Sequence, residues 1–379
     1  MAKLNKKPNQ NISMKLKSSI QAAALGLAGL ALNSQFSTAL AQGSLTPPGP
    51  PGATMLTLSQ IEPRTPIASA PFTITQTGSY YLTTNLTVST GDAIDINTNG
   101  VTLDLNGFTI SSTDAYNNGN GITIKGTLGN ITIANGFIQG GVTNNGSGVY
   151  SGSGFSYGIV GPTAVNVLVS RVSISGCRTI GIYLNLSDST VVESCTVRTV
   201  GANGIYAFTI KQSSVIDCAG DGILGTVVSD CQGQSTFNGS GVQAGTAQNC
   251  WGDSNGSYAG VNASTALNCS GSSSSSGNGV EASTAINCWG RCDGSGSAVH
   301  AYTAQNCYGL SQGSGYGVYA VYIASGCYGY SASGTGLYAQ NAAFCTGYRT
   351  NGTAIQATIA TGCYAASGTN YITYKYNMP

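Results

Sequence analysis

A cysteine recurs at a nearly fixed interval through the second half of this 379-residue chain. Five cysteines are evenly spaced along the chain, and three more continue the series at almost the same interval: Cys231, Cys250, Cys269, Cys288, Cys307, Cys327, Cys345 and Cys363. A constant period of about 20 residues is typical of solenoids, in which neighbouring repeats complete one another's core. We therefore expect stacked repeats rather than a chain folded around a single centre.

The residues between the cysteines indicate that each repeat is built from short strands. Segments 241–252, 260–271 and 279–290 read GVQAGTAQNCWG, GVNASTALNCSG and GVEASTAINCWG. Apolar and polar residues alternate in these words, as in strands with one buried and one exposed face. No repeat offers the roughly 10 to 12 consecutive residues that a helix needs. The sequence predicts an all-β fold, a right-handed parallel β-helix with coils of about 18–23 residues.

The composition excludes several classes of protein. Only 14 residues are basic and 13 acidic, or 7% of the chain, whereas about a quarter is usual. Five of the basic residues fall in the first 17 positions, which leaves 9 basic against 13 acidic residues in the rest. Nucleic acid is therefore not an expected partner, because its binding needs clustered positive charge. The 21 tyrosines and 41% hydrophobic residues argue against disorder.

The N-terminus has the pattern of an export signal. In residues 1–41 a basic stretch ends at Lys17, the apolar run Ile20–Leu32 follows, and a small-x-small pattern ends at Ala41. We expect cleavage near Ala41 and a secreted protein, whether periplasmic, extracellular or at the cell surface. The apolar run is too short to span a bilayer, and no later segment is an uninterrupted apolar run of spanning length. No transmembrane segment is predicted after the signal is removed.

The remaining chain divides by composition into four segments. Residues 42–71 are rich in Pro and Gly and are predicted to form a linker. Residues 72–100 are predicted to be N-terminal capping strands, because the open end of a solenoid exposes a strand edge. The parallel β-helix is expected over 101–370, with residues 371–379 as a C-terminal tail or cap.

Several words in the chain resemble a known group of proteins. These are GSYYL at 78–82, VTLDLNGFTI at 101–110, and the later coils with Ser-Cys or Asn-Cys. Over residues 70–370 the chain resembles the secreted right-handed parallel β-helix repeat proteins, which share the pectate-lyase-like fold. That superfamily contains pectate lyases, polygalacturonases, alginate epimerases and lyases, adhesins and tailspike-like proteins. The resemblance implies the fold but no particular activity, because this fold carries many functions.

Stacked coils place equivalent residues in columns, and two columns have a structural interpretation. They contain Cys231, Cys250, Cys269, Cys288 and Cys307, and Asn249, Asn268, Asn287 and Asn306. The thiols either form a buried column of small apolar groups or are joined by disulfides between coils, since the Cα spacing of about 4.8 Å permits a bridge. The asparagine amides are expected to hydrogen-bond from coil to coil.

One further column holds the candidate catalytic residues. Glu281, His300 and Tyr319 occupy the same repeat position, so their side chains are predicted to be neighbours on one outer face. A carboxylate, an imidazole and a phenol together can transfer protons to and from a sugar acid. The alternative is an ordinary solvent-facing ladder, in which exposed pairs contribute little.

A metal site is not predicted. Cys288, Cys292 and His300, the chain's one histidine, match zinc spacing only weakly, and a fourth ligand is missing. The cysteine column already accounts for Cys288. The sequence predicts no metal and no other cofactor.

A column of aromatic residues follows the cysteines and includes Trp251, Trp289, Tyr308 and Tyr328. Aromatic faces repeated along an outer surface can stack on sugar rings, which makes these residues candidates for ligand binding. Alternatively, the rings pack on one another and cover the edge of the coils.

The chain lacks the words that the resemblance implies for the best-known enzymes. It has no Asn-Thr-Asp, Asp-Asp, Gly-His-Gly or Arg-x-Lys word of a polygalacturonase, and no clustered Asp with a catalytic Arg as in a pectate lyase. We therefore expect an exported, non-catalytic structural protein or one that binds a carbohydrate or cell-surface polymer. The alternative is a polysaccharide lyase or epimerase that acts on an acidic glycan.

Overall fold

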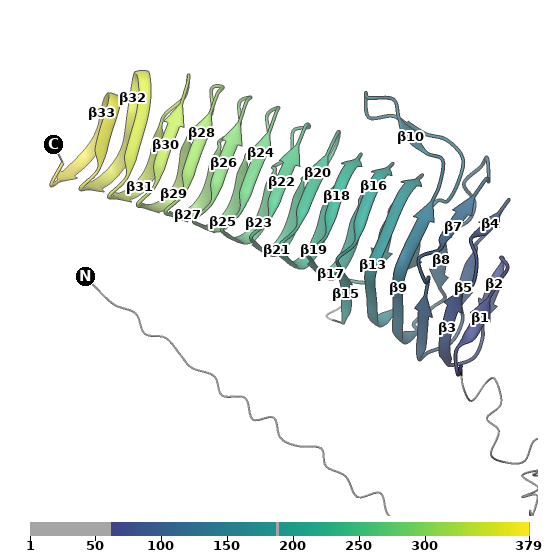
Figure 1. Cartoon of the computed structure of the whole chain (residues 1–379). Coiled ribbons are helices and arrows are strands. Elements are labelled where there is room, and N and C mark those ends of the chain that lie inside the picture. Colours follow the sequence, from purple (N-terminus) through teal and green to yellow (C-terminus); the bar gives the residue numbers. More distant parts are fainter. Residues whose placement is uncertain (1–61, 187–188, 379) are drawn as a thin grey trace, which may run out of the picture. The chain divides into compact units, whose positions relative to one another are not determined.

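The computed structural model describes residues 62–186 and 189–378. The predicted signal peptide, residues 1–41, and most of the predicted linker lie outside these ranges. The described residues form 33 strands and no helix. Of these strands, 31 belong to one sheet that winds through about 16 coils into a parallel β-solenoid, and the other two form a hairpin (Figure 1). The predicted all-β, parallel β-helical fold is confirmed.

Most strands are short, and each strand of the stack pairs in parallel with a strand of at least one neighbouring coil. The N-terminal coils contain β1 (Thr65–Ile67), β2 (Phe72–Ile74), β3 (Gly78–Leu82), β4 (Leu86–Val88), β5 (Ile94–Ile96), β6 (Val101–Asp104), β7 (Thr109–Ser112), β8 (Ile122–Ile124), β9 (Gly129–Gln139), β12 (Ile159–Gly161), β13 (Val165–Cys177) and β14 (Ile182–Leu184). The middle coils contain β15 (Thr190–Glu193), β16 (Thr196–Val200), β17 (Ile205–Lys211), β18 (Ser214–Cys218), β19 (Ile223–Ser229), β20 (Gln232–Ser235), β21 (Val242–Gln248), β22 (Trp251–Ser254), β23 (Val261–Leu267) and β24 (Ser270–Ser273). The C-terminal coils contain β25 (Val280–Ile286), β26 (Trp289–Cys292), β27 (Val299–Gln305), β28 (Tyr308–Ser311), β29 (Val318–Ser325), β30 (Tyr328–Ser331), β31 (Leu337–Ala343), β32 (Thr346–Thr361) and β33 (Tyr364–Tyr376).

A single coil shows the three faces of the solenoid. In β25, residues 280–282 lie on what we call face 1 and residues 284–286 on face 2, and β26 lies on face 3. Residues of these strands pair with their counterparts in the next coil, as Val280 does with Val299 and Ala285 with Ala304. Because coils rise by about 4.8 Å, this register turns each repeat position into a continuous column.

The core is narrow because the inward columns carry small residues. Buried inward positions hold a valine column on face 1, an alanine column on face 2 and cysteines at the corner before face 3: Val242, Val261, Val280, Val299 and Val318; Ala247, Ala266, Ala285 and Ala304; Cys250, Cys269, Cys288 and Cys307. Face 3 lies close to the turn that precedes face 1, since a Cβ added at Gly290 would collide with the carbonyl oxygen of Ala298 in that turn. Glycine is the residue that permits this close approach.

The corner between faces 2 and 3 has a left-handed backbone in successive coils. Asn249, Asn268 and Asn287 have φ of 53°, and Asn306 has φ of 51°. Asparagine and glycine tolerate this conformation best, and glycine takes the position in the next coil at Gly326, with φ of 62°. The Asn-Cys word therefore encodes a sharp turn that directs the cysteine inward.

Strands of the solenoid extend beyond the predicted boundaries of 101–370 on both sides. Strand β1 already pairs in parallel with β3, so coils begin inside the predicted linker, and residues 72–100 form further coils rather than a separate cap. At the other end, β33 runs through the predicted tail at 371–379 and pairs in parallel with β32. The parallel pairing of these outer strands places them in the stack.

Two N-terminal coils are longer than the sequence predicts. Ile94 pairs with Ile122, and Ile122 pairs with Ile159, so each of these coils contains many more residues than the regular repeat. The longer of the two coils includes the hairpin of β10 (Thr143–Asn144) and β11 (Tyr150–Ser151), which stands out from the stack (Figure 1). Insertions in turns lengthen a coil without changing its strand register.

Asp217 fastens this hairpin to the solenoid. Its Oδ1 accepts hydrogen bonds from Nδ2 of Asn144 at 2.6 Å and from the hydroxyl of Tyr150 at 2.7 Å, and its Oδ2 accepts one from Thr199 at 2.9 Å. The hydroxyls of Tyr150 and Thr236 lie 2.6 Å apart. Burial, together with the Asp217 carboxylate, raises the pKa of Tyr150, which keeps the phenol protonated as a donor.

Candidate functional site

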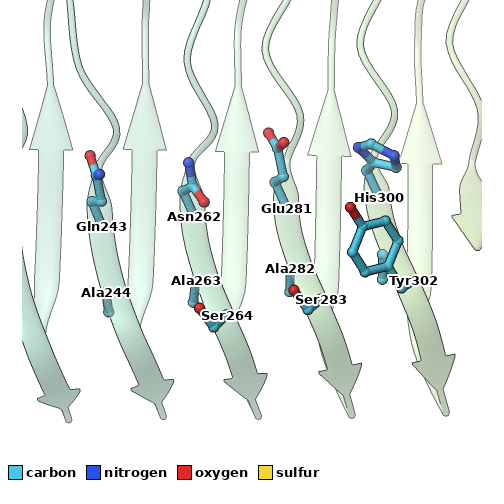
Figure 2. Close-up of a pocket in the computed structure, with 11 residues that line it drawn as sticks. Gln243, Ala244, Asn262, Ala263, Ser264, Glu281, Ala282, Ser283, His300 and Tyr302 are labelled. Atoms are coloured by element: carbon cyan, nitrogen blue, oxygen red, sulfur yellow. The ribbon is translucent and has the colours of Figure 1, made fainter.

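A row of polar side chains crosses four successive coils on face 1. Gln243, Asn262, Glu281 and His300 pair in register on β21, β23, β25 and β27, and their side chains point away from the core (Figure 2). The sequence places them there because each follows an inward-facing valine in a strand of alternating pattern. The row therefore presents amides, a carboxylate and an imidazole side by side.

Small residues leave a hollow beside this row, which we call the face 1 groove. It encloses about 360 Å³ and is lined by Gln243, Ala244, Asn262, Ala263, Ser264, Glu281, Ala282, Ser283, His300, Ala301 and Tyr302. The alanines form the floor at the bend between faces 1 and 2, and Tyr302 rises at one end (Figure 2). Glu281 is the one acidic lining residue, and no lining residue is Lys or Arg.

Asn278, in the turn before β25, connects Glu281 and His300 of the groove. Its Nδ2 donates to Oε2 of Glu281 at 3.0 Å and lies 3.4 Å from Nδ1 of His300. Its Oδ1 accepts the backbone N–H of Ser297 at 2.8 Å. The sequence pattern did not indicate Asn278, because the equivalent turn positions in neighbouring coils hold other residue types and their side-chain directions are not periodic.

Tyrosines continue the polar row in the C-terminal direction. The His300 ring lies 5.0 Å from that of Tyr319, and Tyr319 stacks on Tyr338 at 4.8 Å with an interplanar angle of 7°. Partial burial and the neighbouring Tyr338 raise the pKa of Tyr319. Its phenol therefore stays protonated and is a donor rather than a base.

A second group of tyrosines stands at the N-terminal end of the same face. Tyr157 stacks on Tyr183 at 5.9 Å, and Tyr183 meets Tyr206 edge-on at 5.1 Å. Tyr206 is in the register column that continues through Leu224 to the groove. The polar row is therefore flanked along the solenoid by aromatic residues on both sides.

The structure brings the three candidate catalytic residues together. Glu281 pairs with His300, and His300 pairs with Tyr319, as the repeat register predicts. What the sequence did not show is the bridge through Asn278 and the open floor beside the row. The same geometry suits either proton transfer or hydrogen bonding to a sugar.

The predicted aromatic column lies on face 3, separate from the groove. Trp251 and Trp289 flank Ser270 in register, and their side chains are 37% and 36% exposed. Tyr308, 41% exposed, stacks on Tyr328 with ring centroids 4.9 Å apart and an angle of 8°. The rings both pack on one another and expose area, so neither sequence-based interpretation excludes the other.

All twelve cysteines lie in the described residues, buried and without disulfides. In the column, thiols donate to backbone carbonyl oxygens, as Cys288 does to Ala266 at 3.4 Å and to Ile286 at 3.3 Å. Burial in this column of thiols raises the pKa of Cys288. Of the two predicted arrangements, the structure has the thiol column.

The asparagine amides form a ladder along the corner. Nδ2 of Asn268, Asn287 and Asn306 donates to Oδ1 of the preceding asparagine at 3.2, 3.1 and 3.3 Å, and Asn249 donates to Asp230 at 3.0 Å. These hydrogen bonds link successive coils, so the asparagine column has a structural role, as the sequence predicts.

Within the described ranges, no group of three or more His, Cys, Asp or Glu side chains is arranged to hold a metal ion. Cys292 does not join Cys288, because it pairs with Ser273 and Ser311 in a separate inward column on face 3. No helix long and apolar enough to cross a membrane occurs in the described part of the chain.

No family model and no curated protein matches this chain. Among the solved structures similar to it is the Dettilon tailspike protein, with 11% identity and a TM-score of 0.30 over 83% of this chain and 61% of that chain. Another is a GH136 lacto-N-biosidase from Eubacterium ramulus, with 10% identity and a TM-score of 0.24 over 82% of this chain and 58% of that chain. The chain thus spans about three fifths of each. We carry no residue or activity over from either protein.

Proposed function

We propose that this protein is a non-catalytic carbohydrate-binding protein whose face 1 groove holds an extended polysaccharide along the stack of coils. The observation that carries the proposal is the polar row of Gln243, Asn262, Glu281 and His300 over an alanine floor. Amides and carboxylates provide the donors and acceptors that sugar hydroxyls require. The groove repeats these groups once per coil, which suits a ligand that is itself a repeating chain.

The tyrosines beside the groove support the same ligand class. Tyr206 at one end and Tyr319 with Tyr338 at the other offer ring surface in line with the polar row. Aromatic residues with a polar tip combine apolar contact with a hydrogen bond. The exposed Trp251 and Trp289 on face 3 are a second place where a sugar ring can stack.

We further propose that residues 1–41 direct export and that the ligand is a cell-surface or extracellular polymer. The basic start, apolar run and small-x-small pattern support export. The N-terminal sequence of the protein purified from the extracytoplasmic fraction tests this step. A mature N-terminus at Gln42 is the expected result, and an intact Met1 would contradict it.

The binding test uses the purified chain against a panel of neutral and acidic polysaccharides in affinity electrophoresis. The groove variant is Gln243→Ala with Asn262→Ala, and the matched control is Thr246→Ala with Thr265→Ala on face 2 of the same coils. We expect at least tenfold weaker binding in the groove variant and no change in the control. Retention by no polymer, or equal loss in both variants, would refute the proposal.

A second candidate function is a polysaccharide lyase or epimerase, favoured by the juxtaposition of Glu281, His300 and Tyr319. In β-elimination a base removes the proton next to the sugar carboxylate, the glycosidic C–O bond breaks, and an unsaturated sugar and a new chain end form. The groove lining has no Lys or Arg to neutralise that carboxylate, and the raised pKa of Tyr319 leaves less of the phenolate that would act as the base. These observations make binding the leading proposal.

The ultraviolet absorbance of an unsaturated sugar and the appearance of reducing ends distinguish the two functions. Turnover of any acidic glycan that is lost in His300→Ala would replace the binding proposal with the enzymatic one. Retention of polymer without either signal would support binding.

A further inference from the structure

The orientation of the Asn278 side chain is determined by one contact. The backbone N–H of Ser297 lies 2.8 Å from the Asn278 side chain and can only donate a hydrogen bond, so the atom facing it is the oxygen Oδ1. The amide therefore cannot be flipped without leaving that N–H opposite another donor. Its nitrogen Nδ2 must point to the groove.

The two hydrogens of Nδ2 have two acceptors. One is Oε2 of Glu281 at 3.0 Å, and the other is Nδ1 of His300 at 3.4 Å. An imidazole nitrogen that accepts carries no proton, so in neutral His300 the proton is on Nε2. Nε2 has no hydrogen-bond partner among the described residues and is available as a donor to a ligand.

Other turns show which part of this arrangement belongs to the fold. Oδ1 of Asp221 accepts the backbone N–H of Ser240 at 2.8 Å, and Oδ1 of Asn203 accepts that of Asp221 at 3.0 Å. Bonding the N–H of the next coil is therefore a recurrent turn feature. The donation from Nδ2 to both ionisable residues is specific to Asn278.

We infer that Asn278 is a positioning residue that holds His300 as an outward N–H donor beside the Glu281 acceptor, and that the groove consequently selects neutral glycans over polyuronates. A sugar hydroxyl can accept from Nε2 of His300 and donate to the free carboxylate oxygen of Glu281. A uronate carboxylate would meet the negative charge of Glu281 with no Lys or Arg in the lining. The selectivity rests on the proposed function, whereas the tautomer does not.

The tautomer is measured first, without any ligand. The chain has one histidine, so its imidazole ¹⁵N resonances need no assignment. In the wild type at high pH we expect a protonated Nε2 and an unprotonated Nδ1. Asn278→Asp keeps the acceptor for the Ser297 N–H, as Asp221 does for Ser240, but turns the Nδ2 donor into an acceptor. In this variant we expect the proton of the neutral His300 imidazole to move from Nε2 to Nδ1.

A wild-type proton on Nδ1, or an identical tautomer in Asn278→Asp, would overturn the positioning role. Asn278→Ala is the second variant, because it removes the turn bond to Ser297 as well as the contacts to Glu281 and His300. The difference in stability between Asn278→Ala and Asn278→Asp shows what the turn bond contributes. Equal melting temperatures of the wild type and Asn278→Asp establish that a change of tautomer is not a consequence of misfolding.

Selectivity is measured with neutral glucans, mannans and galactans, each compared with the same polymer oxidised at C6 to the uronate. We expect at least tenfold tighter binding of the neutral form, and at least a fivefold loss of that binding in Asn278→Asp. Tighter binding of the uronate would overturn the selectivity. Binding of neither form would refute the proposed function while leaving the tautomer result standing.

Discussion

The asparagines at the corner between faces 2 and 3, such as Asn287, contribute to the fold through both their backbone and their side-chain amide. The backbone of Asn287 takes φ near 53°, which costs most residues with a Cβ about 1–2 kcal/mol, and its amide bonds to the coils on either side. The repeat made the column visible in the sequence. Serine and glutamine also take a left-handed backbone at this corner, in Ser194 and Gln212, so the ladder of amides between coils is what distinguishes the four coils with asparagine.

These two contributions can be separated at Asn287. Glycine accepts the left-handed backbone without the Cβ penalty but removes the amide, whereas alanine loses both. We expect the urea concentration at the unfolding midpoint to fall from the wild type to Asn287→Gly and again to Asn287→Ala. The alanine variant is expected to be destabilised by about 2 kcal/mol relative to the wild type. An alanine variant as stable as the glycine variant would show that the backbone conformation carries no cost.

The buried thiols make stability depend on pH in the alkaline range. Complete burial raises the pKa of Cys177 to about 12, against about 8.5 in an unfolded chain. Between these values the unfolded state loses a proton that the folded state keeps. Stability is therefore full below about pH 8.5 and falls as pH rises toward 12, by about 1.4 kcal/mol per pH unit for one thiol.

Urea unfolding under reducing conditions at pH 8 and pH 10 checks this dependence. We expect a lower free energy of unfolding at pH 10, and a shallower decline in Cys177→Ala, which has one buried thiol fewer. Identical pH slopes in the two proteins would contradict the assignment to Cys177.

At the scale of elements, the β10–β11 hairpin shows what a repeat pattern leaves out. The strands of regular coils follow from alternation and period. The hairpin belongs to the long coil between Ile122 and Ile159, which has no counterpart elsewhere in the stack, and its partner Asp217 lies several coils further along the chain. Such a contact follows from which turn faces which coil, and that is a property of the assembled stack.

Removing one hydroxyl should release this hairpin and leave the solenoid intact. Tyr150→Phe loses the bonds to Asp217 and Thr236 but keeps the ring in place. We expect amide hydrogen exchange in 141–153 to accelerate at least tenfold, with strand amides of the core unchanged. The control is Tyr116→Phe, whose ring is 83% exposed. Equal exchange in wild type and Tyr150→Phe would show that other contacts hold the hairpin.

At the scale of the whole molecule, the C-terminal coil departs from the rest of the stack. Strand β33 places Asn370 against Ile355 and Lys375 against Ala360, so polar residues occupy two columns that are apolar in the coils before it. Lys375 is exposed at the edge of the described stack, and a charge on an edge strand discourages pairing with another chain. These two residues therefore oppose end-to-end stacking of solenoids at β33.

Restoring apolar residues at these positions tests that role. We expect the double variant Asn370→Val with Lys375→Ala to form oligomers, so that its sedimentation coefficient rises with protein concentration. The sedimentation coefficient of the wild type is expected not to rise with concentration. Thr373→Val is the control, because it adds an exposed apolar group to the same strand without changing the two columns. Unchanged sedimentation of the double variant would show that the edge is protected by other means.

The period of the sequence was sufficient to predict the regular coils, their register and the residues that share a column, because parallel stacking repeats each position once per turn. Glu281 next to His300, the asparagine ladder and the buried cysteines all follow from that one number. The tertiary structure decided what has no period: the place of β1 in the described stack, the hairpin contact and the Asn278 bridge. The reason is physical, since side-chain directions in turns depend on local backbone angles and on the neighbouring coil, which no single repeat encodes.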